Sequence, residues 1–197
     1  MFEQLAAAIP RPLRIIDIGG TNAFWSQRGW AGKDDVRIVT VNLHPESQQF
    51  SNIECRFGDA TSLLGIGDGE FDVAFSNSVI EHLFTKEAQI MMAKEVRRVA
   101  RAYWVQTPNF WFPMEPHFHI PGWQWMPVCV RVALLRRRRC GWRGPIEDPQ
   151  RAREAVAEVR LLTGSEMREL FPGATIWREK LCGMTKSWVA YSGFPSP

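Results

Sequence analysis

The segment from Thr107 to His119 holds the residues of this chain that are best suited to catalysis. It brings Glu115, His117 and His119 close together among prolines and aromatic residues. An imidazole ordinarily titrates near about pH 6.5, so His117 is the first choice for removing a proton from a hydroxyl group. Glu115 and His119 are candidates to orient His117 or to replace it.

The same residue types also fit a structural role or a metal site. The prolines and aromatic residues can pack as a lid, with His117 hydrogen-bonded to a backbone carbonyl group. His117 and His119 can also act as metal ligands, but that site needs a third ligand, which the sequence does not clearly supply. We therefore predict no metal site.

The elements that must position these residues follow from an alternation of strand and helix patterns. Short β-type runs at 14–18, 37–41, 53–57, 71–76 and 103–107 are separated by helical patterns, which predicts a parallel sheet. Residues 174–181 and 186–192 add two strands joined by a turn at Gly183, an antiparallel finish to the sheet. The predicted fold class is therefore α/β, with seven strands and helices on both faces.

The size and composition predict one domain spanning residues 1–197. The chain has 197 residues, of which 45% are hydrophobic and 23% are charged, as in an ordinary globular protein. Residues 108–144 are rich in Pro, Trp, Phe and His and are predicted to be an insertion that forms a lid over the acceptor site. Asp148 and Pro149 then predict a helix to about Val159, and Thr163 with Glu166 predicts a capping box.

The four cysteines and the apolar runs bear on the expected location. Cys55, Cys129, Cys140 and Cys182 are scattered, which indicates neither a disulfide framework nor a zinc site. The opening apolar run is too short for a signal sequence, and no run approaches the roughly 20 apolar residues that cross a bilayer. We therefore expect a cytoplasmic protein, with peripheral membrane contact as an added possibility.

That possibility comes from a basic cluster, Arg136 to Arg139. It ends a predicted helix from Pro121, interrupted near Pro127, with Trp123, Met126, Val130 and Leu134 along one side. Aromatic residues beside a cationic cluster suit an anionic membrane surface or a lipid-linked or phosphorylated acceptor. A solvated helix end is an equal alternative. The net charge of +3 and the absence of an RNA-binding signature disfavour nucleic acid.

The predicted strand ends carry a further set of motifs. The run from Arg14 to Trp25 is a strand that enters a glycine turn, where open α/β sheets bind ligands. Val41-Asn42, Gly58-Asp59-Ala60, the run Phe71 to His82 and Val105-Gln-Thr-Pro-Asn109 follow in order. Together they resemble class I S-adenosylmethionine-dependent methyltransferases, in particular small bacterial ones of the type 11 group. The resemblance implies a Rossmann-like sheet and S-adenosylmethionine as cofactor.

The resemblance also implies roles for individual residues. Asp17, Gly19 and Gly20 would frame the methionine end of the cofactor, and Asn42 would bind the ribose. Asp59, followed by Ala60, would reach the adenine amino group. Asn77 and Ser78 would line the floor near the sulfonium, with Glu81 and His82 on the outer side of the cofactor.

Two departures from the family pattern keep alternatives open. The common D-x-G-x-G-x-G becomes Asp17-x-Gly19-x-Thr21-x-Ala23, and Asn42 stands where an acid is usual. A neutral hydrogen bond gives about 0.5–1.5 kcal/mol, against about 1.5–3 kcal/mol with a charged partner. A non-catalytic binding or scaffold protein that retains the fold is therefore the main alternative, and an RNA methyltransferase a lesser one.

The function that we predict is methyl transfer to an oxygen or nitrogen of a small or lipid-linked acceptor, with oxygen preferred. A nicotinamide oxidoreductase would need G-x-G-x-x-G or Tyr-x-x-x-Lys, and the sequence contains neither. The identity of the acceptor and the oligomeric state are beyond the sequence.

Overall fold

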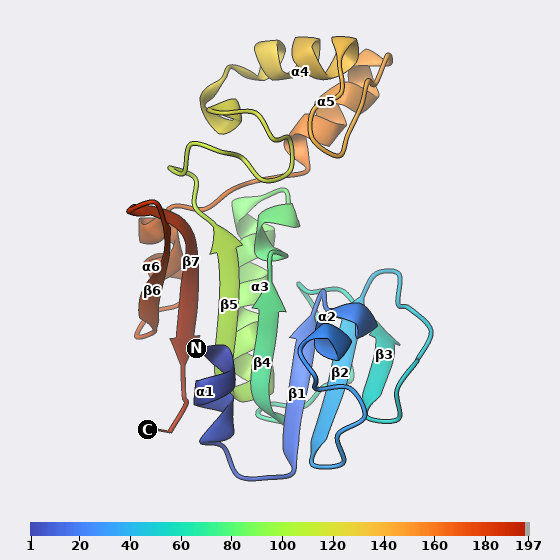
Figure 1. Cartoon of the computed structure of the whole chain (residues 1–197), viewed down its shortest axis with the longest axis vertical. Helices are drawn as coiled ribbons and strands as arrows, with labels where there is room; N and C mark the ends of the chain where they lie inside the picture. Colours follow the sequence, from blue (N-terminus) through green and yellow to red (C-terminus); the bar gives the residue numbers. More distant parts are fainter. Residues whose placement is uncertain (196–197) are drawn as a thin grey trace.

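The computed structural model describes residues 1–195 and contains a seven-stranded sheet of order β3-β2-β1-β4-β5-β7-β6 (Figure 1). Pairing is parallel except along β7, which is antiparallel to both of its neighbours. The predicted Rossmann-like α/β fold with an antiparallel last strand is confirmed. The strands are β1 (Leu13–Ile18), β2 (Val36–Asn42), β3 (Ile53–Phe57), β4 (Phe71–Asn77), β5 (Ala100–Pro108), β6 (Thr175–Leu181) and β7 (Met184–Ser192).

Helices cover both faces of the sheet. The short helices α1 (Phe2–Ala7) and α2 (Asn22–Gln27) belong to one face, where Phe2 and Trp25 pack against Phe75. On the other face, α3 (Lys86–Val99) and α6 (Gly164–Leu170) bury Met92 and Met167 in a second core. Each strand in the middle of the sheet is thus buried on two sides, which explains the apolar runs of β1 and β4.

Side-chain caps fix where several helices begin. Thr21 and Thr85 accept hydrogen bonds from backbone N–H groups three residues later, at the starts of α2 and α3. Thr163 and Glu166 form the predicted capping box of α6. The predicted helix after Asp148 is also present, as α5 (Pro149–Ala157). Such caps satisfy N–H groups that have no partner inside the helix.

Residues 110–159 form a separate folded unit above the carboxyl ends of β4 and β5, and we call this unit the cap (Figure 1). It contains the short 3-10 helix η2 (Trp123–Trp125), α4 (Val128–Arg137) and α5. The cap has its own hydrophobic cluster, in which Phe118 stacks on Trp123 at 4.2 Å between ring centroids. Ala152 and Val156 of α5 complete this cluster, so the folded unit extends past the predicted insertion limit at Gly144.

The predicted apolar side of the helix in this region was wrong in part. Val130 is 42% exposed, whereas Val132 and Leu135 are buried against α5. The reason is the break at Pro127, after which α4 starts with a new orientation, and the residues of η2 no longer share its helical phase. Among the residues that the structure describes, no helix is long and apolar enough to cross a membrane.

Leu135 tests whether the cap is a packed unit, because its side chain is fully buried there. Leu135→Ala should lower the free energy of unfolding by about 2–5 kcal/mol, measured by urea denaturation followed by circular dichroism. The matched control is Leu64→Ala, because Leu64 is 89% exposed, and its effect should stay within about 0.5 kcal/mol. Equal small effects of both variants would contradict a packed cap.

Candidate active site

The glycine turn after β1 forms one end of a groove along the edge of the sheet. Gly19 has a φ of +83°, and a Cβ atom built there would lie 2.3 Å from Val79 Cγ2. A Cβ atom on Gly20 would lie 1.8 Å from Asp17 Oδ2. Both positions therefore require glycine, and Gly20 retains the close backbone approach despite the reduced glycine motif.

Asp17 is buried beneath this turn. Its Oδ2 accepts a hydrogen bond of 2.7 Å from Trp25 Nε1. Burial raises the pKa of Asp17 to about 7, although the Trp25 hydrogen bond and the charge of Arg28 act in the opposite direction. A cavity of about 200 Å³ adjoins this carboxyl group and is lined also by Gly19, Gly20 and Asn77.

A second cavity, of about 320 Å³, continues from Gly19 toward β2 and β3. Its lining includes Asn42, Asp59, Ala60 and His82, four of the residues predicted to bind the cofactor. Asn42 Nδ2 donates to the Gly20 carbonyl oxygen at 2.7 Å, so this amide also braces the glycine turn. Asp59 Oδ1 accepts from both the backbone N–H and the hydroxyl of Thr61.

Asn77 is the last residue of β4, and Ser78 follows it. Asn77 lines the same cavity as Asp17 and the glycine turn, and its predicted place near the sulfonium stays a prediction. Ser78 adopts a left-handed φ of 57°, and its hydroxyl donates to Gln106 Oε1 at 2.9 Å. Ser78 does not line either of the two cavities beside Gly19, so its predicted place on the cofactor floor stays a prediction.

His82 and His117 meet where the cap joins the sheet. His82 ends the 3-10 helix η1 (Ile80–His82), and its Nε2 lies 3.2 Å from Nε2 of His117 in the cap. His117 Nδ1 lies 2.6 Å from Glu115 Oε1, while Glu115 Oε2 accepts from the backbone N–H groups of His117 and Phe118. Glu115 is 1% exposed, and these hydrogen bonds hold its carboxylate in place. The carboxylate in turn fixes the orientation of the His117 ring.

Glu81 lies behind this pair and is fully buried. Its Oε2 accepts from the Thr107 hydroxyl at 2.9 Å, whereas its Oε1 has no hydrogen-bond partner within residues 1–195. Burial raises the pKa of Glu81 to about 7. Burial also lowers the pKa of His82, and the charges of His117 and Arg143 add to that effect.

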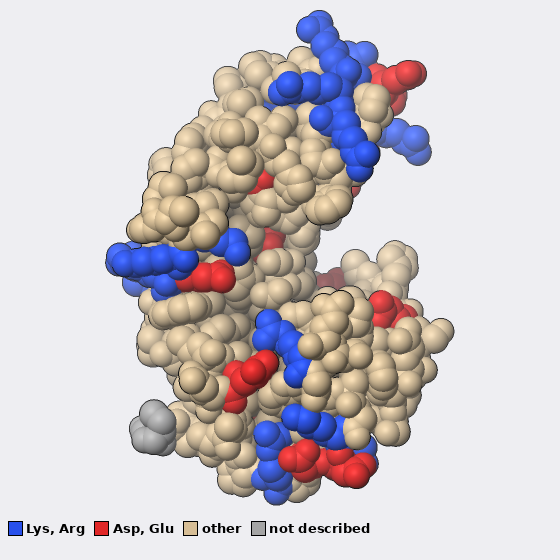
Figure 2. Space-filling view, viewed as in Figure 1, with Lys and Arg blue, Asp and Glu red and all other residues tan. Residues whose placement is uncertain are grey.

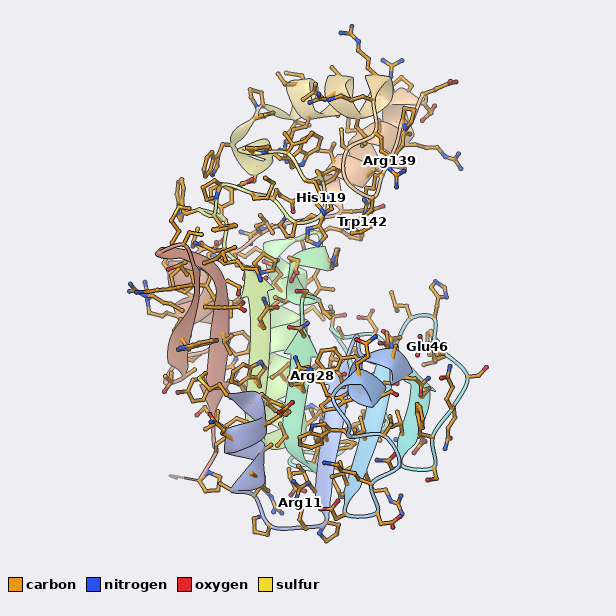
Figure 3. All side chains as sticks on the ribbon, viewed as in Figure 1. Arg11, Arg28, Glu46, His119, Arg139 and Trp142 are labelled. Carbon is orange, nitrogen blue, oxygen red and sulfur yellow. The ribbon has the colours of Figure 1, made fainter. Side chains whose placement is uncertain are left out.

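His119 lies apart from the His82–His117 contact. It is exposed, and its ring meets Trp142 edge-on at 5.1 Å between centroids. Figure 3 shows the two side chains together in the part of the cap nearest the sheet, and Figure 2 shows an open notch between the cap and the rest of the molecule. The structure brings together Glu115 and His117 of the predicted catalytic set, but not His119.

A third cavity, of about 180 Å³, lies inside the cap and is lined by Glu115, Phe118, Trp123, Gln124 and Arg131 among others. Gln124 Oε1 and Arg131 Nε are buried atoms without a hydrogen-bond partner in the described part of the chain. Burial lowers the pKa of Arg131. This cavity therefore offers the guanidinium groups of Arg131 and Arg160, the carboxylate of Glu115, one amide and an aromatic wall to a ligand.

The four arginines Arg136 to Arg139 are exposed at the far end of the cap, where they form a basic surface (Figure 2). Arg136 Nε donates to the Glu147 carbonyl oxygen, and Arg139 Nε donates to that of Gly141. These contacts leave most guanidinium donors directed to solvent, which is compatible with a membrane-binding surface and with a solvated helix end. Membrane contact stays a prediction.

Comparison with known proteins agrees with this geometry. Residues 19–102 match the family model of a methyltransferase domain. An uncharacterised protein of Mycobacterium tuberculosis is 35% identical over 85 residues, which are 43% of this chain and 28% of that protein. The chain thus spans less than a third of the length of this curated relative.

Solved structures share the fold over nearly the whole chain. An S-adenosylmethionine-dependent methyltransferase from Methanosarcina mazei is 12% identical with a TM-score of 0.55, over 97% of this chain and 96% of that one. One from Mesorhizobium loti is 14% identical with a TM-score of 0.55, over 96% and 95%. At these identities the likeness concerns the fold.

The sheet order and the glycine turn beside Asp17 agree with the Rossmann-like fold of class I methyltransferases. Residues 19–102 match the model of a methyltransferase domain, and the solved structures of S-adenosylmethionine-dependent methyltransferases share the fold of the chain. S-adenosylmethionine is the cofactor of this family. The two cavities that meet at Gly19 fit an extended ligand with two ends.

Sequence reasoning missed three features of the site. Trp25 holds Asp17, Arg131 enters the cap cavity, and Glu81 with His82 faces His117. The contact between Trp25 and Asp17 could have been predicted, because the two residues are eight positions apart in the same motif. The contacts of Arg131 and His117 depend on how the cap folds over the sheet, and no local sequence pattern indicates that fold.

The raised pKa of Asp17 predicts a pH dependence of stability. From about pH 4 to about 7 the unfolded chain has released this proton while the folded protein keeps it, so stability falls as the pH rises. Relative to Asp17→Asn, the wild-type free energy of unfolding should decline by up to about 1.4 kcal/mol per pH unit and level off above pH 7. Urea denaturation from pH 5 to 8 measures this difference, and parallel curves for the two proteins would contradict it.

Proposed function

We propose that this chain transfers the methyl group of S-adenosylmethionine to an oxygen of a small or lipid-linked acceptor, bound between the cofactor groove and the cap. One observation carries the proposal: His82 lines the cavity beside Asn42 and Asp59, and its Nε2 is 3.2 Å from His117 of the cap. The candidate catalytic residues and the cofactor groove therefore meet at one point.

The chemistry required of the protein is modest. S-adenosylmethionine supplies an activated methyl group when it is bound. The residues of this chain must align an acceptor oxygen with that group and keep water out, which rigid positioning achieves. The cap provides the enclosing surface, and the buried Glu115 makes the position of His117 rigid.

His117 is the residue that we propose to receive the acceptor hydroxyl. Its Nδ1 faces the Glu115 carboxylate, which favours the tautomer with a proton on Nδ1 and a free electron pair on Nε2. That electron pair can accept the hydrogen bond of a hydroxyl group and then its proton. Glu115 acts as a positioning residue, and His119 remains a candidate only for contact with the outer part of the acceptor.

The cap cavity supports an acceptor that carries a negative charge beside an apolar or aromatic part. Arg131 supplies a guanidinium group with an unused buried donor, and Phe118 and Trp123 supply the apolar wall. Arg136 to Arg139 would extend the same preference to a lipid-linked acceptor at an anionic membrane surface.

Cofactor binding should be measurable by calorimetry with S-adenosylmethionine and S-adenosylhomocysteine. Wild-type protein should bind both saturably, and Asp59→Ala should weaken binding about 10- to 150-fold, since a hydrogen bond to a charged group contributes about 1.5–3 kcal/mol. Asp34→Ala, which changes an exposed carboxylate in the turn before β2, should bind like wild type. If neither ligand binds wild-type protein, the proposed methyltransferase activity is refuted and a non-catalytic scaffold protein is favoured.

Turnover tests the role of His117. In an assay of S-adenosylhomocysteine release over a panel of anionic phenols and hydroxy acids, His117→Ala should lose about 10²–10⁴-fold in rate at unchanged cofactor affinity. Cys182→Ala, at the exposed β6–β7 turn, is the control and should keep full rate. Full turnover by His117→Ala would remove His117 from the mechanism.

A further inference from the structure

Glu81, His82 and His117 form a cluster of possible metal ligands. Each offers one ligand atom, and these atoms all lie within 4.8 Å of one another. Glu81 and His82 come from η1, which follows β4, whereas His117 comes from the cap. The cluster therefore joins the sheet to the cap beside the cofactor groove.

The two imidazole groups are spaced as metal ligands are. Zinc binds histidine nitrogen at about 2.0–2.1 Å in tetrahedral sites, which places two such nitrogens about 3.3 Å apart. The observed separation between His82 Nε2 and His117 Nε2 is 3.2 Å. Without a metal, the same distance suits a hydrogen bond in which His82 Nε2–H donates to His117 Nε2.

The second coordination shell is also present. Metal-binding histidines almost always bond a carboxylate or carbonyl group through the other ring nitrogen, which fixes the ring and its tautomer. Glu115 holds His117 Nδ1 at 2.6 Å and is itself held by two backbone N–H groups. His117 Nε2 is thus prepared to bind a cation.

Glu81 adds an independent indication. Its side chain is fully buried, yet Oε1 has no hydrogen-bond partner among the residues that the structure describes. A buried carboxylate oxygen without a partner is costly, and a bound cation would offset that cost. A carboxylate and two imidazoles together form a ligand set typical of zinc and other divalent transition metals.

We propose that a carboxylate oxygen of Glu81, His82 Nε2 and His117 Nε2 bind one divalent transition-metal ion, and the 3.2 Å between the two nitrogens suits zinc. A fourth position is left for the acceptor oxygen, whose location rests on the proposed function; metal binding itself does not. With the metal bound, His117 Nε2 is a ligand and is no longer the proton acceptor of the proposed function. The metal would acidify the coordinated hydroxyl, whose proton would pass to solvent, and the O–CH₃ bond would form as the S–CH₃ bond breaks and S-adenosylhomocysteine leaves.

This site differs from the histidine pair that the sequence brings together. His117 and His119 are close in the sequence and were considered together as metal ligands. In the structure His117 contacts His82, and the ring of His119 packs against Trp142. The third ligand that the sequence did not clearly supply is Glu81, which the family resemblance places beside the cofactor.

Cobalt and zinc titrations test the site without any need for turnover. Full-length protein freed of metal by a chelator should bind one Co²⁺, with visible d–d absorption, and one Zn²⁺ by calorimetry. His82→Gln, His117→Ala and Glu81→Gln should each weaken Zn²⁺ binding by at least about 100-fold, because loss of an outer-shell partner alone costs about 10–100-fold. Glu115→Gln should weaken Zn²⁺ binding by about 10–100-fold, because Glu115 is an outer-shell partner.

The two remaining histidines of the chain give matched controls. His44→Ala and His119→Ala should bind Zn²⁺ like wild type, and circular dichroism should show that every variant folds. Absence of stoichiometric metal binding by wild-type protein would overturn the inference, as would unchanged binding by folded His82→Gln.

Calorimetry with S-adenosylhomocysteine on the same samples separates this inference from the proposed function. Cofactor binding without metal binding would overturn the metal site and leave the methyltransferase assignment intact. Metal binding without cofactor binding would support the site and overturn the proposed function.

Discussion

Parallel pairing of β1 with β2 and β4, and of β4 with β5, is the constraint on which the site depends. Strands that run in the same direction end at the same edge of a sheet, so the residues that follow them are brought together. Asp17, Asn42 and Asn77 reach this edge from three strands. The chain leaves β5 there as well, and the cap therefore stands above the carboxyl ends of β4 and β5 (Figure 1).

Three buried carboxyl groups at this edge are stabilised in different ways. Asp17 accepts one indole N–H, and Glu115 accepts two backbone N–H groups and faces an imidazole. Glu81 has the Thr107 hydroxyl on one oxygen only. Since burial of a carboxyl group is costly without partners, the incomplete set of hydrogen bonds around Glu81 is what supports its proposed role as a metal ligand.

Much of the fold was predictable because it depends on local patterns. Alternating strands and helices, the caps at Asp148 and Thr163 and the turn at Gly183 each have a signature within a few residues. The cap was less predictable. The sequence placed Trp123 and Val130 along one side of a helix interrupted near Pro127, whereas the structure buries Trp123 in η2 and leaves Val130 exposed on α4.

The candidate site divides in the same way. Asp17 lies near the end of β1, and Gly19 and Asp59 follow β1 and β3; these groove residues were predicted from motifs that resemble those of the family. The contact between His82 and His117 joins positions 35 residues apart and depends on the path of the cap, which no motif specifies. His119 illustrates the limit of sequence-based prediction. Although it is two residues from His117, its ring packs against Trp142 and not beside His82.

The most direct test of a shared active site is a crystal structure with S-adenosylhomocysteine bound. We predict adenosine beside Asn42 and Asp59, the methionine end beside Asp17, and the sulfur directed toward His82 and His117. A ligand bound elsewhere, or bound with its sulfur directed away from the cap, would contradict the claim that the cofactor groove and the cap form one active site.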